Sequence, residues 1–141
     1  MVEPYPRKLV PTSHERLVWG RGDGSDLEVY ATDVGVVGGL ICYEHSSPLF
    51  RYSLIAAREQ IHVACWPGGL RTMQSIIDAA ARHHAFEAQA FVLSVSSVLT
   101  PEVLAALGDA AKRLLPGGGS TCPGVSASTG LAWQSAQSIG I

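Results

Sequence analysis

Apolar residues along the chain gather into three short uncharged runs. The runs cover residues 36–42, 61–66 and 90–98, and each has the length of a strand rather than of a helix. Continuous runs of this kind are typical of strands that are buried on both faces of a sheet. A shorter alternating stretch at 27–32 predicts one further strand.

Helical periodicity fills the intervals between and after the apolar runs. Residues 46–60 predict a helix that has Leu49 and Tyr52 on one face. Residues 70–88 predict a second helix, and residues 101–115 a third that ends before a glycine-rich turn. Strands that alternate with helices predict an α/β layered architecture.

This pattern stops near residue 119. Residues 1–26 are rich in proline, glycine and charge and predict a loop with little regular structure. Residues 120–141 carry no charged side chain and show no clear period. We therefore expect a domain over 1–119, followed by a divergent tail over 120–141 that packs poorly.

Composition excludes several classes of function. The formal net charge is −2 and no basic stripe is present, so we expect no nucleic-acid partner. No run of eighteen uncharged apolar residues exists, and the N-terminus lacks the apolar core of a signal peptide, so we expect no membrane association. The three cysteines form no CxxC pair, which favours reduced thiols in the cytoplasm over a disulfide or a metal site. These cysteines are Cys42, Cys65 and Cys122.

Cys42 is the first candidate for chemistry, because it closes an apolar strand just before a predicted helix. A thiol near a helix N-terminus ionises more easily, and the thiolate is the nucleophilic form. The backbone N–H of Tyr43 can stabilise an anion that develops on a substrate. Glu44 and His45 add acid–base groups beside the thiol. The competing interpretation is an inert cysteine that fills the core.

Two longer segments make the pattern specific. Residues 39–68 read GLICYEHSSPLFRYSLIAAREQIHVACWPG, and residues 7–27 read RKLVPTSHERLVWGRGDGSDL. The first resembles the nucleophile region of the nitrilase branch of the carbon–nitrogen hydrolases, and the second resembles the lysine block of the same family. Both blocks occur in the family's order and at its separation, and the resemblance covers about residues 6–119.

The resemblance implies a partial αββα sandwich and hydrolysis of a nitrile to a carboxylic acid and ammonia, without metal or cofactor. In that family a cysteine, a glutamate and a lysine act together through thioimidate and thioester intermediates. By position, Cys42 matches the nucleophile, Lys8 the lysine that stabilises the tetrahedral intermediate, and Glu15 a second glutamate beside them. Four residues are expected around the oxyanion and the substrate, and the full-length family forms homo-oligomers. These four are Tyr43, Glu44, His45 and Trp66.

Departures from the family pattern limit this expectation. The family's general-base glutamate comes from an N-terminal block, and no residue before Lys8 stands in a matching context. We therefore expect an internal segment of a nitrilase, cut or frame-shifted near Ser120, with impaired activity. The alternatives are a non-catalytic remnant or assembly subunit of a nitrilase oligomer, and an amidase or cyanide-degrading member of the superfamily.

Several residues also have a purely structural interpretation. Without the resemblance, Lys8 would be a solvated surface charge, and Glu15 a loop partner of Arg16. His62 lies in a predicted strand and is expected to be a hydrogen-bonded structural histidine. His83 and His84 are expected at a helix–loop boundary, and Cys65 as a small buried residue.

Overall fold

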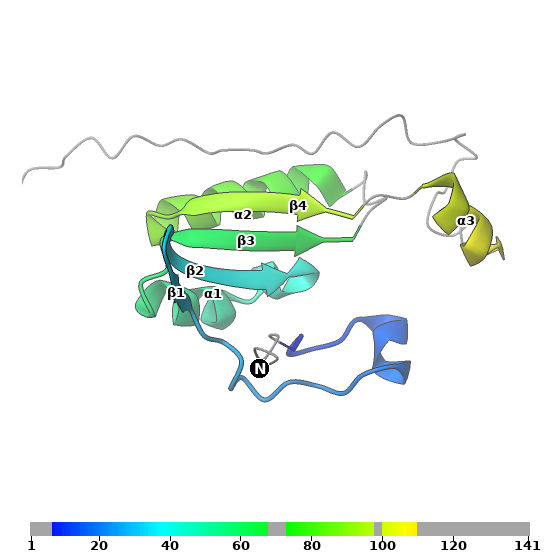
Figure 1. The fold of residues 1–141 in the computed structure, drawn as a ribbon, viewed down its shortest axis with the longest axis horizontal. Helices are drawn as coiled ribbons and strands as arrows, with labels where there is room; N and C mark the ends of the chain where they lie inside the picture. Colours follow the sequence, from blue (N-terminus) through cyan, green and yellow to red (C-terminus); the bar gives the residue numbers. More distant parts are fainter. Residues whose placement is uncertain (1–6, 68–72, 98–99, 110–141) are drawn as a thin grey trace, which may run out of the picture.

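The computed structural model describes residues 7–67, 73–97 and 100–109 and contains one sheet (Figure 1). The strand order is β1-β2-β3-β4. The short β1 pairs antiparallel with β2, whereas β2, β3 and β4 are parallel. The strands are β1 (Tyr30–Thr32), β2 (Gly35–Ile41), β3 (Ile61–Trp66) and β4 (Phe91–Ser96).

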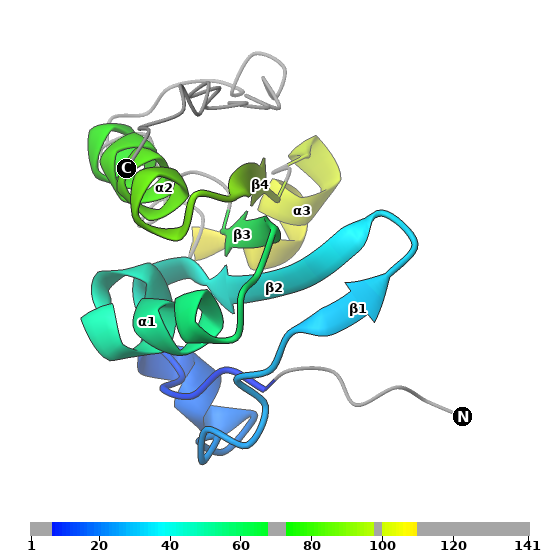
Figure 2. The same cartoon turned by 90° about the vertical axis from the view of Figure 1, so that its left-hand side faces the viewer.

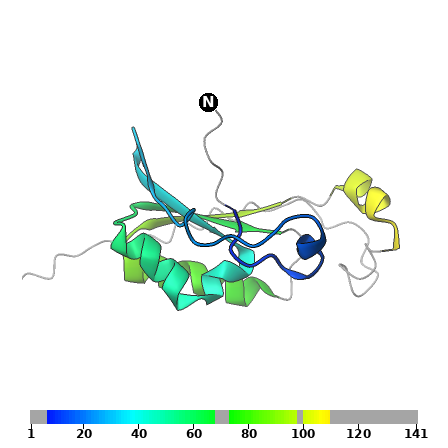
Figure 3. The ribbon, with the colours of Figure 1, turned by 90° about the horizontal axis from the view of Figure 1, so that it is seen from below.

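Two helices cover one face of this sheet (Figures 2 and 3). Helix α1 (Pro48–Ala56) connects β2 to β3, and helix α2 (Gln74–Ala88) precedes β4. Helix α3 (Pro101–Leu107) lies beyond the strand ends, away from the sheet (Figure 1). The described residues thus form one sheet and one helix layer, which confirms the α/β class and fits part of an αββα sandwich. None of these helices is long and apolar enough to span a bilayer.

Two 3₁₀ helices complete the described elements, η1 (Ser13–Leu17) and η2 (Cys42–Ser46). The remainder of residues 7–29 is irregular, as the proline and glycine content predicts. The segment passes beneath the sheet close to the end of β2 (Figure 1). The predicted tail over 120–141 lies outside the described residues.

The apolar core lies between the sheet and its two helices. Ala64, Trp66, Ile77 and Val92 form one buried cluster, and Leu54 of α1 is fully buried. The helix prediction for α1 is confirmed, but the predicted apolar face is not the buried one. Leu49 and Tyr52 are 75% and 66% exposed. Helical period alone cannot decide which side of a helix meets the sheet when apolar residues lie on both sides.

The opposite face of the sheet is not covered by any described residue. Its β4 side chains Phe91, Leu93 and Val95 are exposed, although Val92 between them is only 2% exposed. The strands were expected to be buried on both faces, and within the described residues that expectation is wrong. An apolar run shows that a strand prefers burial, but it does not show what provides the cover.

The glycine pair of β2 brings neighbouring groups close to the strand. A Cβ on Gly39 would lie 2.9 Å from the Val63 carbonyl oxygen. A Cβ on Gly38 would overlap the carboxylate of Glu59. Glycine is therefore required at both positions, and at Gly38 it makes room for a buried acid.

Thr100 caps α3, because its hydroxyl accepts a hydrogen bond from the Val103 N–H. Two local predictions are wrong. His83 and His84 lie inside α2 rather than at its boundary, because α2 continues to Ala88. Cys65 is exposed rather than buried, because it lies on the uncovered face of β3.

Candidate active site

Cys42 occupies a sharp turn between β2 and η2. Its φ angle is 55°, a left-handed conformation that side chains other than glycine rarely adopt. Such strain costs about 1–3 kcal/mol and persists only where surrounding contacts enforce it. The turn directs the chain from the sheet into η2, and a cavity of about 440 Å³ opens beside the thiol. The cavity walls include Lys8, Glu15, Cys42, Cys65 and Trp66.

Lys8 and Glu15 form an ion pair on one wall of this cavity. Lys8 Nζ donates to Glu15 Oε2 at 2.7 Å and to the Thr12 hydroxyl at 2.8 Å. Burial raises the pKa of Glu15, but hydrogen bonds from Lys8 and the Thr12 backbone and the Lys8 charge hold it below its ordinary value. The pair is therefore a carboxylate bound to an ammonium. The cavity thus brings together Lys8 and Glu15 beside the thiol, as the resemblance implies.

Glu44 ties the lysine segment to the nucleophile strand. Its side chain is buried, and its two oxygens accept hydrogen bonds from the Leu9 N–H at 2.7 Å and the Ile41 N–H at 2.9 Å. Leu9 follows Lys8, and Ile41 precedes Cys42. A single carboxylate therefore fixes the backbones of both segments. Glu44 is not one of the described residues that line the cavity.

The other residues expected to contact the substrate also differ in whether they reach the cavity. Trp66 ends β3 and lines the cavity beside Cys42. The side chain of Tyr43 is on the outside at 68% exposure, and that of His45 is 2% exposed within the core. His45 stacks on Trp66 with 4.6 Å between ring centroids. Oxyanion and substrate roles for Tyr43, Glu44, His45 and Trp66 stay predictions.

A buried polar chain runs from the nucleophile turn into the core. His45 Nδ1 lies 2.8 Å from the Cys42 carbonyl, and His45 Nε2 lies 3.0 Å from His62 Nε2. His62 Nδ1 lies 2.9 Å from Glu59 Oε2, and His84 Nε2 lies 2.5 Å from Glu59 Oε1. His62 is thus hydrogen-bonded, as the sequence predicted. We call these four side chains the His–Glu chain, and sequence reasoning did not find it as a unit.

Burial dominates the titration of this chain. It lowers the pKa of His45 to about 4, against the hydrogen bond with the Cys42 carbonyl. Burial also lowers the pKa of His62, and the hydrogen bond and charge of Glu59 work against that lowering. For Glu59 itself, burial raises the pKa, but hydrogen bonds from His62 and His84 outweigh burial and bring it below its ordinary value.

Glu59, His62 and His84 are also the described groups closest to a metal-ligand arrangement. Their ligand atoms all lie within 4.8 Å of one another. However, each imidazole contacts its own carboxylate oxygen at 2.9 or 2.5 Å. Two ligands of one tetrahedral zinc ion lie about 3.3 Å apart, so the contacts fit hydrogen bonds better. The donor set therefore does not favour a metal.

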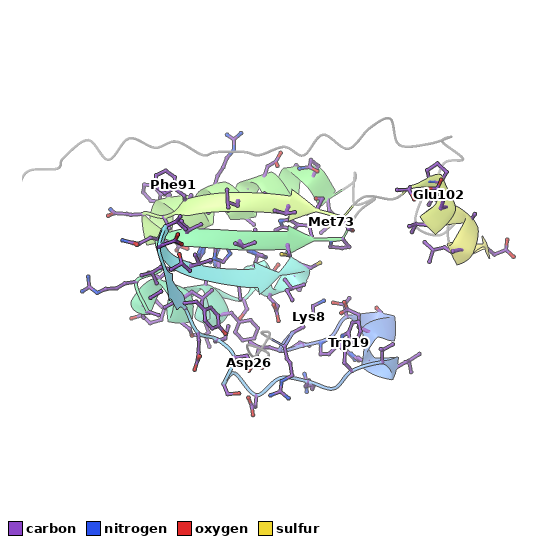
Figure 4. All side chains as sticks on the ribbon, in the orientation of Figure 1. Lys8, Trp19, Asp26, Met73, Phe91 and Glu102 are labelled. Atoms are coloured by element: carbon purple, nitrogen blue, oxygen red, sulfur yellow. The ribbon has the colours of Figure 1, made fainter. Side chains whose placement is uncertain are left out.

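A second cavity lies on the other side of the Lys8–Glu15 pair. Its walls include Arg7, Arg21 and Trp19. Arg7 is held by Asp26 at 3.0 Å. Figure 4 shows Lys8, Trp19 and Asp26 on the same N-terminal segment, below the end of β2. Trp19 is 55% exposed, so its ring is available to line a binding surface.

Comparisons with known proteins agree with this geometry. Residues 4–122 match the family model described as carbon-nitrogen hydrolase. The chain is 43% identical over 122 residues to a nitrilase of Pseudomonas syringae pv. syringae (strain B728a), covering 80% of this chain and 36% of that protein. It is 42% identical over 103 residues to an aliphatic nitrilase of Rhodococcus rhodochrous, covering 68% of this chain and 28% of that protein.

A relative named for a different specificity is equally similar. The chain is 42% identical over 125 residues to an arylacetone-specific nitrilase of Alcaligenes faecalis, covering 82% of this chain and 35% of that protein. The chain thus spans about a third of the length of these relatives. The family match over residues 4–122 includes the Cys42 turn and the Lys8–Glu15 pair.

Proposed function

The chain belongs to the carbon–nitrogen hydrolase family, and on that premise we propose that the protein hydrolyses a nitrile to a carboxylic acid and ammonia with Cys42 as nucleophile. One observation carries the proposal: Cys42, Lys8 and Glu15 line the same cavity, although more than twenty residues separate the first from the other two. A thiol beside a buried ammonium suits a reaction in which a nitrogen anion develops.

The chemistry requires two molecules of water for each nitrile. The Cys42 thiolate forms a C–S bond to the nitrile carbon, and the nitrogen takes up a proton to give a thioimidate. One water adds to this carbon, and the C–N bond breaks to release ammonia and leave a thioester. A second water then breaks the C–S bond, which releases the carboxylic acid and restores the thiol. Lys8 is placed to stabilise the negative charge of the tetrahedral intermediates.

Glu15 supports Lys8 rather than acting as the base. Among the described residues of the cavity wall it is the one carboxylate, and its Oε2 already accepts hydrogen bonds from Lys8 and the Thr12 N–H. A carboxylate held in this way is a poor proton acceptor. We propose that a group outside the described residues activates the thiol and the waters.

The substrate is a small nitrile. The nitrilase branch of the family fits better than the amidase or cyanide-degrading alternatives. The relatives named above are all nitrilases, which supports this choice. They include both an aliphatic and an arylacetone-specific enzyme, so we propose no narrower class of nitrile. Cys42 and Cys65 are both free thiols in the described structure, which fits a reducing compartment such as the cytoplasm.

The uncovered sheet face favours association between copies of the chain. This is related to the assembly subunit given above as an alternative function. Phe91, Leu93 and Val95 are exposed together on β4, and a contiguous apolar surface promotes contact between molecules. We propose that two copies of the isolated chain cover each other's sheet faces. Light scattering during size-exclusion chromatography measures the mass directly, and a monomer at micromolar concentration contradicts this proposal.

Trapping of the covalent intermediate tests the nitrilase proposal. The chain is incubated with an aliphatic and an aromatic nitrile and analysed by mass spectrometry after acid quenching. We expect the mass of a thioimidate or thioester on the peptide that contains Cys42. Cys42→Ala should abolish the adduct, whereas Cys65→Ser, a change at the other cysteine of the cavity wall, should retain it. An adduct on Cys65 alone, or no adduct and no ammonia, contradicts the proposal.

A further inference from the structure

The His–Glu chain ends on the backbone of the proposed nucleophile. His45 Nδ1 faces the carbonyl of Cys42, which can only accept a hydrogen bond, so this nitrogen carries a proton. Further from the turn, Glu59 contacts both His62 and His84. Four side chains from η2, β3, α2 and the turn before β3 thus form one connected path to a single peptide group.

A count of protons shows what this path requires. Four contacts join the five groups, and each needs one hydrogen between its two heavy atoms. Three neutral imidazoles supply one hydrogen each, and the Glu59 carboxylate supplies none. The path is therefore one proton short unless one of three groups takes up the missing proton: His45 or His62 by double protonation, or Glu59. Because burial lowers the pKa of His45 to about 4, the proton falls to His62 or Glu59.

The burial of these side chains also indicates that the chain holds one added proton. The side chains of Glu59, His62 and His84 are fully inaccessible to solvent. A carboxylate surrounded by neutral imidazoles would leave a net negative charge in the core, which costs several kcal/mol. The added proton makes the chain neutral. Arg51 of α1, a cation whose charge acts on His45, is engaged by His83 and Glu87 of α2.

The Cys42 turn needs a restraint of this kind. Its φ of 55° is strained, and two contacts hold it from either side. Glu44 accepts from the Ile41 N–H before the thiol, and His45 donates to the Cys42 carbonyl after it. The contact of its other nitrogen with His62 and the stacked ring of Trp66 together fix that orientation.

We propose that His45, His62, Glu59 and His84 form one positioning chain that holds the Cys42 turn in its left-handed conformation, and that this chain carries a single proton shared by His62 and Glu59. The inference deepens the proposed function, since the turn carries the proposed nucleophile. It makes His45 a positioning residue rather than a substrate contact. Gly38 belongs to the device, because any Cβ there would displace the Glu59 carboxylate.

Glu59→Gln separates the proton count from the shape of the chain. The amide can accept from His84 and donate to His62, so all four contacts are satisfied with three neutral imidazoles and no added proton. Long-range ¹⁵N NMR of the histidine rings reads the protonation of each nitrogen directly. We expect the wild-type chain to show a pH transition shared by His62 and His45 between pH 5 and 9, and the variant to show none.

The rate at which iodoacetamide alkylates Cys42, read on its own peptide by mass spectrometry, reports on the turn. The amide nitrogen of His45→Asn can replace Nδ1, so we expect its rate to stay within about twofold of wild type. The amide nitrogen of His45→Gln replaces Nε2, so the carbonyl contact is lost and we expect a rate about tenfold lower. Gly38→Ala should resemble His45→Gln. Gly20→Ala, where a Cβ meets nothing within 4 Å, should resemble wild type.

The outcomes are distinct. Three neutral imidazoles beside an ionised Glu59 throughout pH 5–9 would overturn the shared proton. Equal alkylation rates in His45→Asn and His45→Gln, with dispersed NMR spectra in both, would overturn the positioning role. A tightly bound metal, found by elemental analysis and lost in Glu59→Gln, would also overturn the proposal. None of these readouts needs nitrile turnover, so failure of the proposed function leaves them intact.

Discussion

Two glutamates lie on opposite sides of the Cys42 turn, and they differ mainly in their access to solvent. Glu59 is buried beneath the helices with two histidines as partners. Glu15 lines the cavity with Lys8, and its side chain is 35% exposed. In each case the hydrogen bonds of the partners outweigh the effect of burial and hold the pKa below its ordinary value.

This difference in solvent access suits the two acids to different roles at the same turn. A buried carboxylate cannot exchange partners with water, so it suits a role that fixes geometry. A carboxylate on a cavity wall can be reached by a ligand, so it suits a role near the reacting atoms. Substitutions at Glu59 should therefore change stability most, and substitutions around Glu15 should change chemistry most.

The largest expected effect tests this contrast directly. Glu59→Ala leaves nitrogens of His62 and His84 buried without a partner, and we expect it to lower the free energy of unfolding by about 3–5 kcal/mol. Glu15→Ala should cost about 1 kcal/mol, since solvent replaces part of the lost contact. Urea denaturation followed by circular dichroism measures both. Equal losses in the free energy of unfolding would show that the two acids contribute equally to stability, against this contrast.

Acid should weaken the fold through the buried side of the turn. His45 has a pKa of about 4 in the folded chain, below its ordinary value of 6.5. Its stabilising contribution is therefore complete above pH 6.5 and is lost as the pH falls toward 4, by about 3 kcal/mol. Glu15, whose pKa is also held below its ordinary value, shifts the stability in the same direction at lower pH. His45→Asn should flatten the wild-type decline between pH 6.5 and 4, and parallel curves would contradict this origin.

The sequence predicted the cavity side of the turn far better than the buried side. Cys42, Lys8 and Glu15 stand in blocks whose residue types are specific, so their joint placement on one cavity wall could be expected. The path through Glu59, His62 and His84 depends on pairings between β2, β3 and α2, and no local pattern encodes these. A glycine inside an apolar strand indicates a close approach, but Gly38 by itself does not show that an acid makes it.

The same limit explains the fold predictions. Apolar runs located β2, β3 and β4 to within one or two residues, since a run of this length fits little else. They could not show that a single face is covered, because cover depends on elements elsewhere in the chain. The buried face of α1 was missed for that reason: Leu54 meets the core, while Leu49 does not.

A matched pair on β4 extends the contrast to apolar side chains. Val92 faces the helices and is 2% exposed, whereas Val95 faces the uncovered side and is 52% exposed. In dilute solution, where the proposed dimer dissociates, we expect Val92→Ala to cost about 2 kcal/mol and Val95→Ala less than about 0.5 kcal/mol. At concentrations at which the dimer forms, the cost of Val95→Ala should rise toward that of Val92→Ala. Both substitutions remove the same atoms from one strand, so the change in β-strand propensity is the same in both and does not affect their difference. A similar cost for Val95→Ala would indicate that its face is covered in solution, as the dimer proposal requires.

The smallest change in stability should accompany a clear change in reactivity at the cavity. Lys8→Met removes the ammonium and leaves Glu15 free to be hydrated, so we expect a stability change within about 1 kcal/mol. The Lys8 charge favours anions near the thiol, so Cys42 should lose about fivefold in its rate with iodoacetate relative to iodoacetamide at low salt. Arg21→Met removes an equal charge from the neighbouring cavity and should change that ratio much less. If both variants lower it equally, the effect comes from net charge, and Lys8 has no special position beside the thiol.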